Sequence, residues 1–130
     1  MNLSLNDKES KTFHGIINGE VRCCVNQWDD DTCRVPSQKR LKDAKHGHAI
    51  LDKWQKTQPT ISGTNFIDLG VVVACNLDLT PEEVTYSKNL LAHNAKELRK
   101  ALQNVPTPYT GVYLVFDEEA TNAESILARI

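Results

Sequence analysis

The sequence predicts an α+β fold with an N-terminal β-hairpin, an amphipathic basic helix, and then a βαβ-like unit with a long helix and a terminal helix. Three observations predict it: an Asn18-Gly19 turn between two apolar runs, a helix capping box that begins at Thr80, and a valine-rich run just before that box. The alternative is a mostly helical fold with one hairpin, because periodicity alone does not separate a short buried strand from a buried helix.

The hairpin is predicted over residues 12–28. Asn18-Gly19 favours a two-residue turn, since both central residues of that turn need a positive φ that Asn and Gly tolerate. In the second strand, Val21, Cys23 and Val25 share one face, because successive strand residues point to opposite sides. We therefore expect that face to lie in the core.

The amphipathic basic helix is predicted over residues 38–56. Ser37 is a residue type that suits the N-cap position of a helix. Leu41, Ala44, His48 and Leu51 recur at helical spacing, with Ile50 and Trp54 beside them, and form the inner stripe. The opposite side is rich in lysine, so we expect a helix with an apolar inner face and a basic outer face.

The long helix is predicted over residues 81–104. Thr80 suits the N-cap, Pro81 suits the first helical position, and Glu83 completes a capping box. An apolar stripe follows at helical spacing, formed by Val84, Leu91, Ala95, Leu98, Leu102 and Val105. We expect this stripe to pack inside a monomer, and the alternative is a dimer that pairs through the helix at 81–104.

Strands are predicted on both sides of that helix, over residues 66–77 and 110–116, followed by a terminal helix over residues 117–130. Val71-Val72-Val73 favours the first strand, although the same run is long enough for a buried helix. The order strand, helix, strand indicates a right-handed crossover between parallel strands. No internal repeat is evident, and we expect residues 1–130 to form a single compact domain.

The composition indicates a soluble, cytoplasmic protein. The first residues lack the basic start and the apolar run of a signal peptide. The longest apolar stretch, residues 66–77, is shorter than the roughly 20 residues that span a bilayer. The four cysteines of such a protein are expected to be free thiols. We predict no cofactor and no membrane association.

Charge is distributed unevenly along the chain. The net charge is −2, yet residues 34–56 hold seven basic and two acidic residues, a local charge of +5 that leaves −7 for the remainder. A basic helix face can dock on an acidic protein surface or neutralise phosphates. The predicted binding residues are Lys39, Arg40, Lys42, Lys45, His46, Lys53 and Lys56.

Cys23, Cys33, His46 and His48 raise the question of a zinc site. Zinc ligands usually come as two close pairs held by short turns, and these four residues do not have that spacing. His46 and His48 are two residues apart, which places them about 200° apart around a helix. We therefore predict no metal site and keep zinc as an open alternative.

Carboxylates at the predicted strand ends supply another alternative. Asp78 follows the first predicted parallel strand, and Asp117, Glu118 and Glu119 follow the second. Because the carboxyl ends of parallel strands meet at one edge of a sheet, these groups could bind a divalent cation and hydrolyse a phosphoester. Helix capping explains the same residues more simply, since carboxylates are favourable at helix N-termini.

The sequence holds no catalytic signature, no phosphate-binding glycine loop and no cofactor motif. By elimination, we expect a small binding protein that docks on a larger macromolecule, most simply a protein, as an inhibitor or adaptor. Blocking a nucleic-acid-handling protein is one form of that role. The alternatives are a small metal-dependent phosphoester hydrolase and direct nucleic-acid binding through the basic helix.

Overall fold

The computed structural model is mostly helical. It describes residues 1–28, 37–61, 64–65, 72–104 and 110–130, and it describes the backbone alone for residues 23–28, 37–41, 60–61, 64–65 and 110. Within these ranges the elements are β1 (Asn2–Leu5), α1 (Asp7–Trp28), α2 (Ser37–Thr57), β2 (Thr60–Ile61), β3 (Thr64–Asn65), β4 (Cys75–Asp78), α3 (Pro81–Leu102) and α4 (Thr110–Leu127). This order agrees with the mostly helical alternative.

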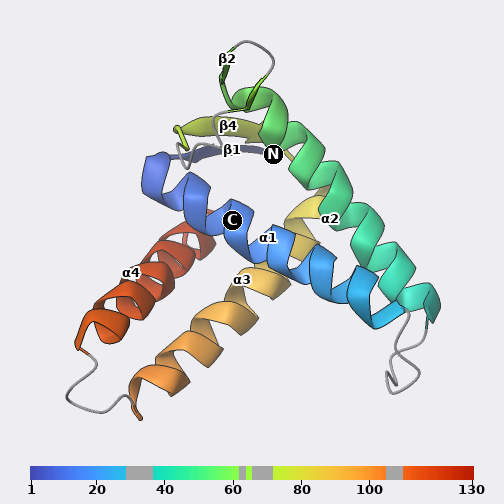
Figure 1. The fold of residues 1–130 in the computed structure, drawn as a ribbon. Helices are drawn as coiled ribbons and strands as arrows, with labels where there is room; N and C mark the ends of the chain where they lie inside the picture. The colour runs from blue at the N-terminus through green and yellow to red at the C-terminus, as the bar shows by residue number, and fades with distance from the viewer. Residues whose placement is uncertain (29–36, 62–63, 66–71, 105–109) are drawn as a thin grey trace.

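The strands β1 and β4 come from distant parts of the chain and pair antiparallel. Leu3 lies opposite Leu77, and Leu5 lies opposite Cys75. These four side chains are buried and the alternate residues are exposed, so the pair has one core face and one outer face. Figure 1 shows the two strands side by side across the helices. The short strands β2 and β3 pair with each other.

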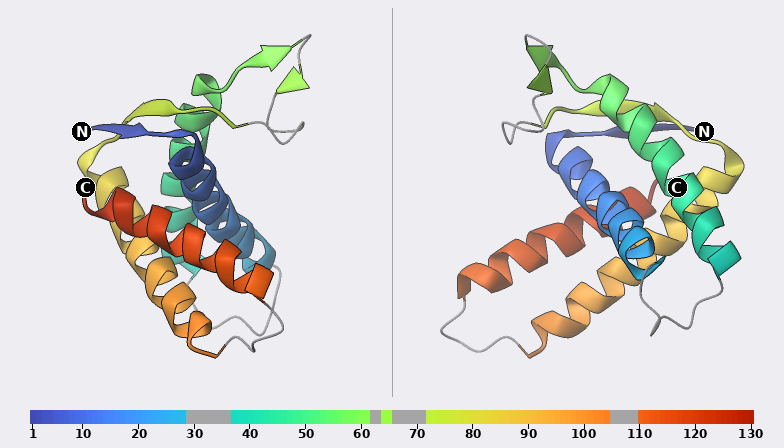
Figure 2. Two further views of the ribbon diagram at one scale, coloured as in Figure 1. Left: turned by 90° about the vertical axis from the view of Figure 1, so that its left-hand side faces the viewer. Right: turned by 45° about the vertical axis from the view of Figure 1, so that its right-hand side comes forward.

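Two helix pairs extend from beneath β1 and β4 and diverge from each other (Figures 1 and 2). α1 packs on α2, α3 packs on α4, and α1 also contacts both helices of the other pair. The core consists of Leu3, Leu5, Phe13, Ile17, Val21, Ile50, Trp54, Cys75, Leu77, Leu79, Leu91, Ala95, Ala123 and Ile126. Not one of the described helices has the length and apolar character needed to cross a membrane.

The predicted hairpin over residues 12–28 is wrong, because this segment lies inside α1. The helix starts at a capping box that the sequence analysis missed. The Asn6 side chain accepts a hydrogen bond from the Glu9 backbone N–H at 2.8 Å, and the Glu9 carboxylate accepts one from the Asn6 backbone N–H at 3.1 Å. These reciprocal bonds satisfy backbone donors that a helix N-terminus otherwise leaves unpaired.

An apolar stripe then carries α1 through the expected turn. Phe13, Ile17 and Val21 repeat every fourth residue and are buried, which is helical spacing. Their burial outweighs the turn preference of Asn18-Gly19, whose glycine costs about 1 kcal/mol relative to alanine in a helix. The strand alternation that we inferred for Val21 is therefore incidental to a helical pattern.

The predicted strand over residues 110–116 is also wrong, because α4 begins at Thr110 and continues through most of the predicted terminal helix. Residues that favour strands do so mainly through packing against a neighbouring strand, and none of the described strands pairs with this segment. α4 instead packs on α3, with Ala120, Ala123 and Ile126 buried. Helix packing thus overrides the local strand preference.

The parallel crossover does not form among the described residues. Residues 75–77 of the predicted strand 66–77 lie in β4, while residues 66–71 are outside the described part of the chain. β4 pairs antiparallel with β1, a strand at residues 2–5 that the sequence analysis did not predict. The βαβ-like unit is therefore wrong.

The two middle helices are confirmed. The helix predicted over 38–56 corresponds to α2, and the helix predicted over 81–104 corresponds to α3, including its capping box. The apolar stripe of α3 is buried within the chain at Leu91, Ala95 and Leu102. At these positions the stripe therefore packs in the core of this chain.

The structure also shows an internal repeat. α1 corresponds to α3 at an offset of 74 residues, each with 22 residues, and the strands that precede them, β1 and β4, begin 73 residues apart. The strand pairing fits a local two-fold relation, because Leu3 lies opposite Leu77, its own equivalent at that offset. We call β1, α1 and α2 the first half, and β4, α3 and α4 the second half.

Burial follows the same relation. At the offset of 74 residues the equivalent buried pairs are Glu9 and Glu83, Phe13 and Ser87, Ile17 and Leu91, and Val21 and Ala95. The later helices match at an offset of 73 residues, with the buried pairs Gly47 and Ala120, and Ile50 and Ala123. The two halves therefore share a frame of buried positions although most residue types differ.

Candidate functional site

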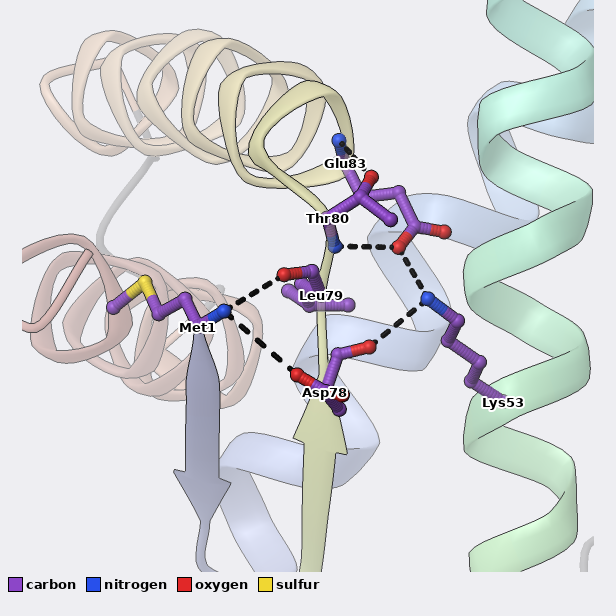
Figure 3. A network of polar contacts seen from close by, with 6 residues as sticks. All are labelled: Met1, Lys53, Asp78, Leu79, Thr80 and Glu83. Carbon is purple, nitrogen blue, oxygen red and sulfur yellow. Dashed lines mark hydrogen bonds and ion pairs between the residues drawn. The ribbon is translucent and has the colours of Figure 1, made fainter.

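Lys53, one of the predicted binding residues, is held by the protein's own acid. Its ammonium group donates to a Glu83 carboxylate oxygen at 2.5 Å and to the Asp78 carbonyl oxygen at 2.9 Å, as Figure 3 shows. Burial alone would raise the pKa of Glu83, but hydrogen bonds from Lys53 and from the Thr80 backbone outweigh it and hold that pKa below its usual value. Lys53 therefore stabilises the fold through these contacts.

Glu9 has the equivalent arrangement in the first half. Its carboxylate accepts a hydrogen bond from the Arg129 guanidinium at 2.5 Å and another from the Ser125 hydroxyl at 2.9 Å. Burial opposes ionisation here too, but the bonds from Arg129, the Asn6 backbone and Ser125 hold the pKa of Glu9 below its usual value. Each capping-box glutamate thus ties the start of one helix to a cation from a distant part of the chain.

Three other predicted residues, Lys42, Lys45 and Lys56, point outward from α2 and are exposed. Their spacing places them within about 60° of one another around the helix axis. None of the ion pairs recorded for the described residues includes them. We call these three residues the lysine face.

The remaining predicted binding residues do not extend the lysine face. Lys39 and Arg40 lie in α2, but their side chains are outside the described part of the structure. His46 is half-buried and turns toward α3, where its ring centre lies 6.0 Å from that of Tyr86. His46 therefore belongs to the contact between α2 and α3.

A cavity of about 880 Å³ lies between α2 and α3, next to the lysine face. It is lined by Glu20 of α1, by Lys42, Asp43 and His46 of α2, and by Pro81, Glu82, Thr85, Tyr86, Asn89, Leu90 and His93 of α3. A cavity of this size suits a small organic ligand or an inserted side chain. The cavity was not predicted from the sequence, although Glu82, Asn89 and His93 recur at helical spacing on one polar side of α3.

Gly47 lets three helices approach closely beside this cavity. A Cβ atom at Gly47 would overlap the Val21 side chain of α1 and would lie 3.0 Å from the Tyr86 hydroxyl of α3. Glycine is therefore required for this close approach, which places Tyr86 against α2 in the cavity wall.

The zinc alternative finds no support in the described residues. His46 lines the cavity, whereas His48 is exposed on another side of α2. The side chains of Cys23 and Cys33 are outside the described part of the chain. Among the side chains that the structure does describe, no group of three or more His, Cys, Asp or Glu residues is placed to hold a metal ion.

The carboxylates of the hydrolase alternative lie in separate contacts. Asp78 lies 3.7 Å from the N-terminal ammonium group at the end of β4. Asp117 accepts from Arg99 at 2.5 Å, and Glu118 lies 3.6 Å from the Lys8 ammonium group. The parallel strand pair that would place these carboxylates at one sheet edge is absent from the described residues.

The start of α4 exposes a run of large apolar side chains. Val112, Tyr113, Leu114 and Val115 are each 42–61% exposed. Contiguous exposed apolar residues are typical of surfaces that contact other macromolecules. Nothing in the described part of the structure shows what covers this run.

Comparison with protein-family models, with curated proteins and with solved structures finds no significant match to this chain. The protein is therefore characterised by its own fold and candidate site. It is a mostly helical chain of two related halves, with a lysine face on α2 and a cavity between α2 and α3.

Proposed function

We propose that this chain is a small binding protein that docks on an acidic surface of a larger protein through the lysine face, as an inhibitor or adaptor does. The observation that supports it is the contrast between Lys53, which is used inside the fold, and Lys42, Lys45 and Lys56, which are exposed and outside the recorded ion pairs of the described residues. Exposed cations on one helix side steer association with an acidic surface.

The neighbouring acids favour a protein partner over a nucleic acid. Asp52 is exposed on the same side of α2 as the lysine face, and Asp43 and Glu82 line the adjacent cavity. These carboxylates repel a phosphate backbone, whereas a protein surface offers groups of both signs. A nucleic-acid-handling protein with an acidic patch fits this description, and docking there would block its surface.

Affinity purification from the native cells with matched charge reversals tests the proposal. The test variant is Lys42→Glu/Lys45→Glu/Lys56→Glu, and the control is Lys88→Glu/Lys96→Glu/Lys100→Glu, which makes the same charge change at exposed positions of α3. We expect a partner that the wild type and the control recover equally and that the test variant loses by about tenfold or more. Equal recovery by both variants would overturn the proposal.

The same variants separate the nucleic-acid alternative. Binding of DNA or RNA through the lysine face predicts retardation in gels at low salt that falls steeply as salt is added. We expect no retardation of either nucleic acid by the wild type. Retardation that the test variant loses and the control keeps would replace the protein partner with a nucleic acid.

A further inference from the structure

The charge lining the cavity between α2 and α3 differs from the charge of the lysine face. Glu20, Asp43 and Glu82 contribute three carboxylates, and Lys42 contributes one ammonium group. Carboxylates therefore outnumber ammonium groups in the lining. None of the recorded ion pairs among the described residues involves Asp43 or Glu82.

The equivalent place in the other half has a different chemistry. At the offsets that relate the halves, Asp43 corresponds to Phe116 and Glu82 corresponds to Lys8. There Lys8 lies 3.6 Å from Glu118 and thereby links α1 to α4. The carboxylates are therefore present at one of the two related interfaces and not at the other. The fold that the two halves share does not require them.

We infer that the cavity between α2 and α3 binds an organic cation, with a guanidinium or ammonium group on a short aliphatic stem. The carboxylates of Asp43 and Glu82 supply the charge. The aromatic ring of Tyr86 supplies a face on which a cation is attracted. Leu90 and Pro81 supply apolar surface for the stem.

The same features select among ligands. A guanidinium group matches carboxylates with two parallel hydrogen bonds and stacks on an aromatic ring, so it fits better than a compact ammonium group. An inorganic anion meets the repulsion of the cavity carboxylates. The cation can be a free small molecule or a basic side chain that a partner inserts, and both have the same recognition chemistry. Lys42 borders both the cavity and the lysine face, but the test of the inference leaves all three lysines of that face unchanged.

Titration of the full chain, followed by ¹H–¹⁵N nuclear magnetic resonance, tests the inference. The free cation is n-butylguanidine, the inserted side chain is represented by acetyl-Gly-Arg-Gly-amide, and the neutral control is the same peptide with citrulline in place of arginine. We expect saturable shifts of residues that line the cavity with both cations, and none with the citrulline peptide or with inorganic phosphate. Tighter binding of the arginine peptide assigns the site to a partner's side chain, and equal binding assigns it to a free cation.

Paired variants make the test specific. Asp43→Asn/Glu82→Gln removes two cavity charges, and Glu97→Gln/Glu119→Gln removes two exposed charges elsewhere on α3 and α4. We expect the dissociation constant for the arginine peptide to rise about tenfold or more in the cavity variant and to stay unchanged in the control. The amide spectrum of each variant serves to check that it is folded. Absence of saturable shifts with either cation, equal response to citrulline, or equal affinity of both variants would overturn the inference.

Discussion

The two halves of the molecule share a pattern of buried positions and differ in the residues at those positions. Each half begins with a strand and a capped helix whose glutamate is buried and bound by a cation from a distant segment, Arg129 for Glu9 and Lys53 for Glu83. Between α1 and α4, Asn122 donates to Thr12 at 3.2 Å, whereas the related contact between α3 and α2 is hollowed by the cavity. Equivalent positions therefore stabilise the fold, and the differences between halves locate the candidate site.

The largest expected effect comes from the equivalent core residues Ile17 and Leu91, which are both fully buried. Truncating either one to alanine removes apolar burial and leaves a cavity, at a cost of about 3 kcal/mol in the free energy of unfolding. If the two positions are equivalent, Ile17→Ala and Leu91→Ala should cost the same within about 1 kcal/mol. Urea denaturation measures both, and a large cost at only one position would contradict the shared frame.

The buried capping-box glutamates should give the next largest effect. Glu9→Gln and Glu83→Gln keep a side chain of the same shape but weaken charged hydrogen bonds to a partner cation. We expect each to lower the free energy of unfolding by about 2 kcal/mol. The exposed Glu97→Gln serves as the control and should stay within about 0.5 kcal/mol of the wild type. A cost at Glu83 alone would show that only the second half depends on its ion pair.

The start of α3 was predictable from local sequence, whereas the start of α1 was missed. Thr80 to Glu83 is a capping box with a proline at the first helical position, so several local signals agree. Asn6 and Glu9 form the same box in the structure, but Asn18-Gly19 farther along α1 carries a strong hairpin signal. Burial of the apolar stripe on α1 favours the helix over the hairpin, and that burial depends on helices far away in sequence.

The repeat was hidden for a related physical reason. The equivalent buried positions hold Phe13 in one half and Ser87 in the other, so side-chain volume is distributed differently between them. The fold requires these positions to be buried but accepts different residue types at them, since cores tolerate substitution when overall volume and pattern are kept. Over the strands and the capping boxes, four pairs of equivalent residues are identical: Asn2 and Asn76, Leu3 and Leu77, Leu5 and Leu79, and Glu9 and Glu83.

The candidate site was predicted in part. Helical spacing identified α2 as basic, and it is a helix with Lys42, Lys45 and Lys56 exposed. The internal use of Lys53 could not be predicted, because it depends on Glu83 from a helix 30 residues away. The cavity likewise depends on how α2 and α3 pack, which no local pattern in either helix determines.

The close approach at Gly47 supplies a smaller effect that distinguishes the halves, because its equivalent in α4 is Ala120. Gly47→Ala gains helix propensity of about 1 kcal/mol, but its Cβ would overlap Val21 and crowd Tyr86. Overpacking costs about 1–3 kcal/mol, so we expect a net loss of about 1 kcal/mol and altered amide shifts of Tyr86. Ala120→Gly should also destabilise by about 1 kcal/mol, without affecting Tyr86. A Gly47→Ala variant more stable than wild type would show that the helices leave room for a Cβ atom at this position.

The smallest expected effect is a pH dependence confined to the first half. His14 stacks on Trp54 with ring centres 4.0 Å apart, and its equivalent in the second half is Lys88. Burial, and to a smaller extent the positive charge of Arg22, lowers the pKa of His14 below 6.5. The unfolded chain therefore binds a proton at this histidine more readily than the folded chain does.

It follows that the free energy of unfolding should fall as the pH drops below 6.5, until the folded histidine also becomes protonated. The lowered pKa values of Glu9 and Glu83 act in a separate window, where stability is lost as the pH falls below 4.5. Urea denaturation between about pH 7.5 and 5.5 should show a decline in the wild type that His14→Gln reduces, while Glu9→Gln keeps it. Identical profiles for wild type and His14→Gln would contradict this assignment and leave the two halves alike in their response to mild acid.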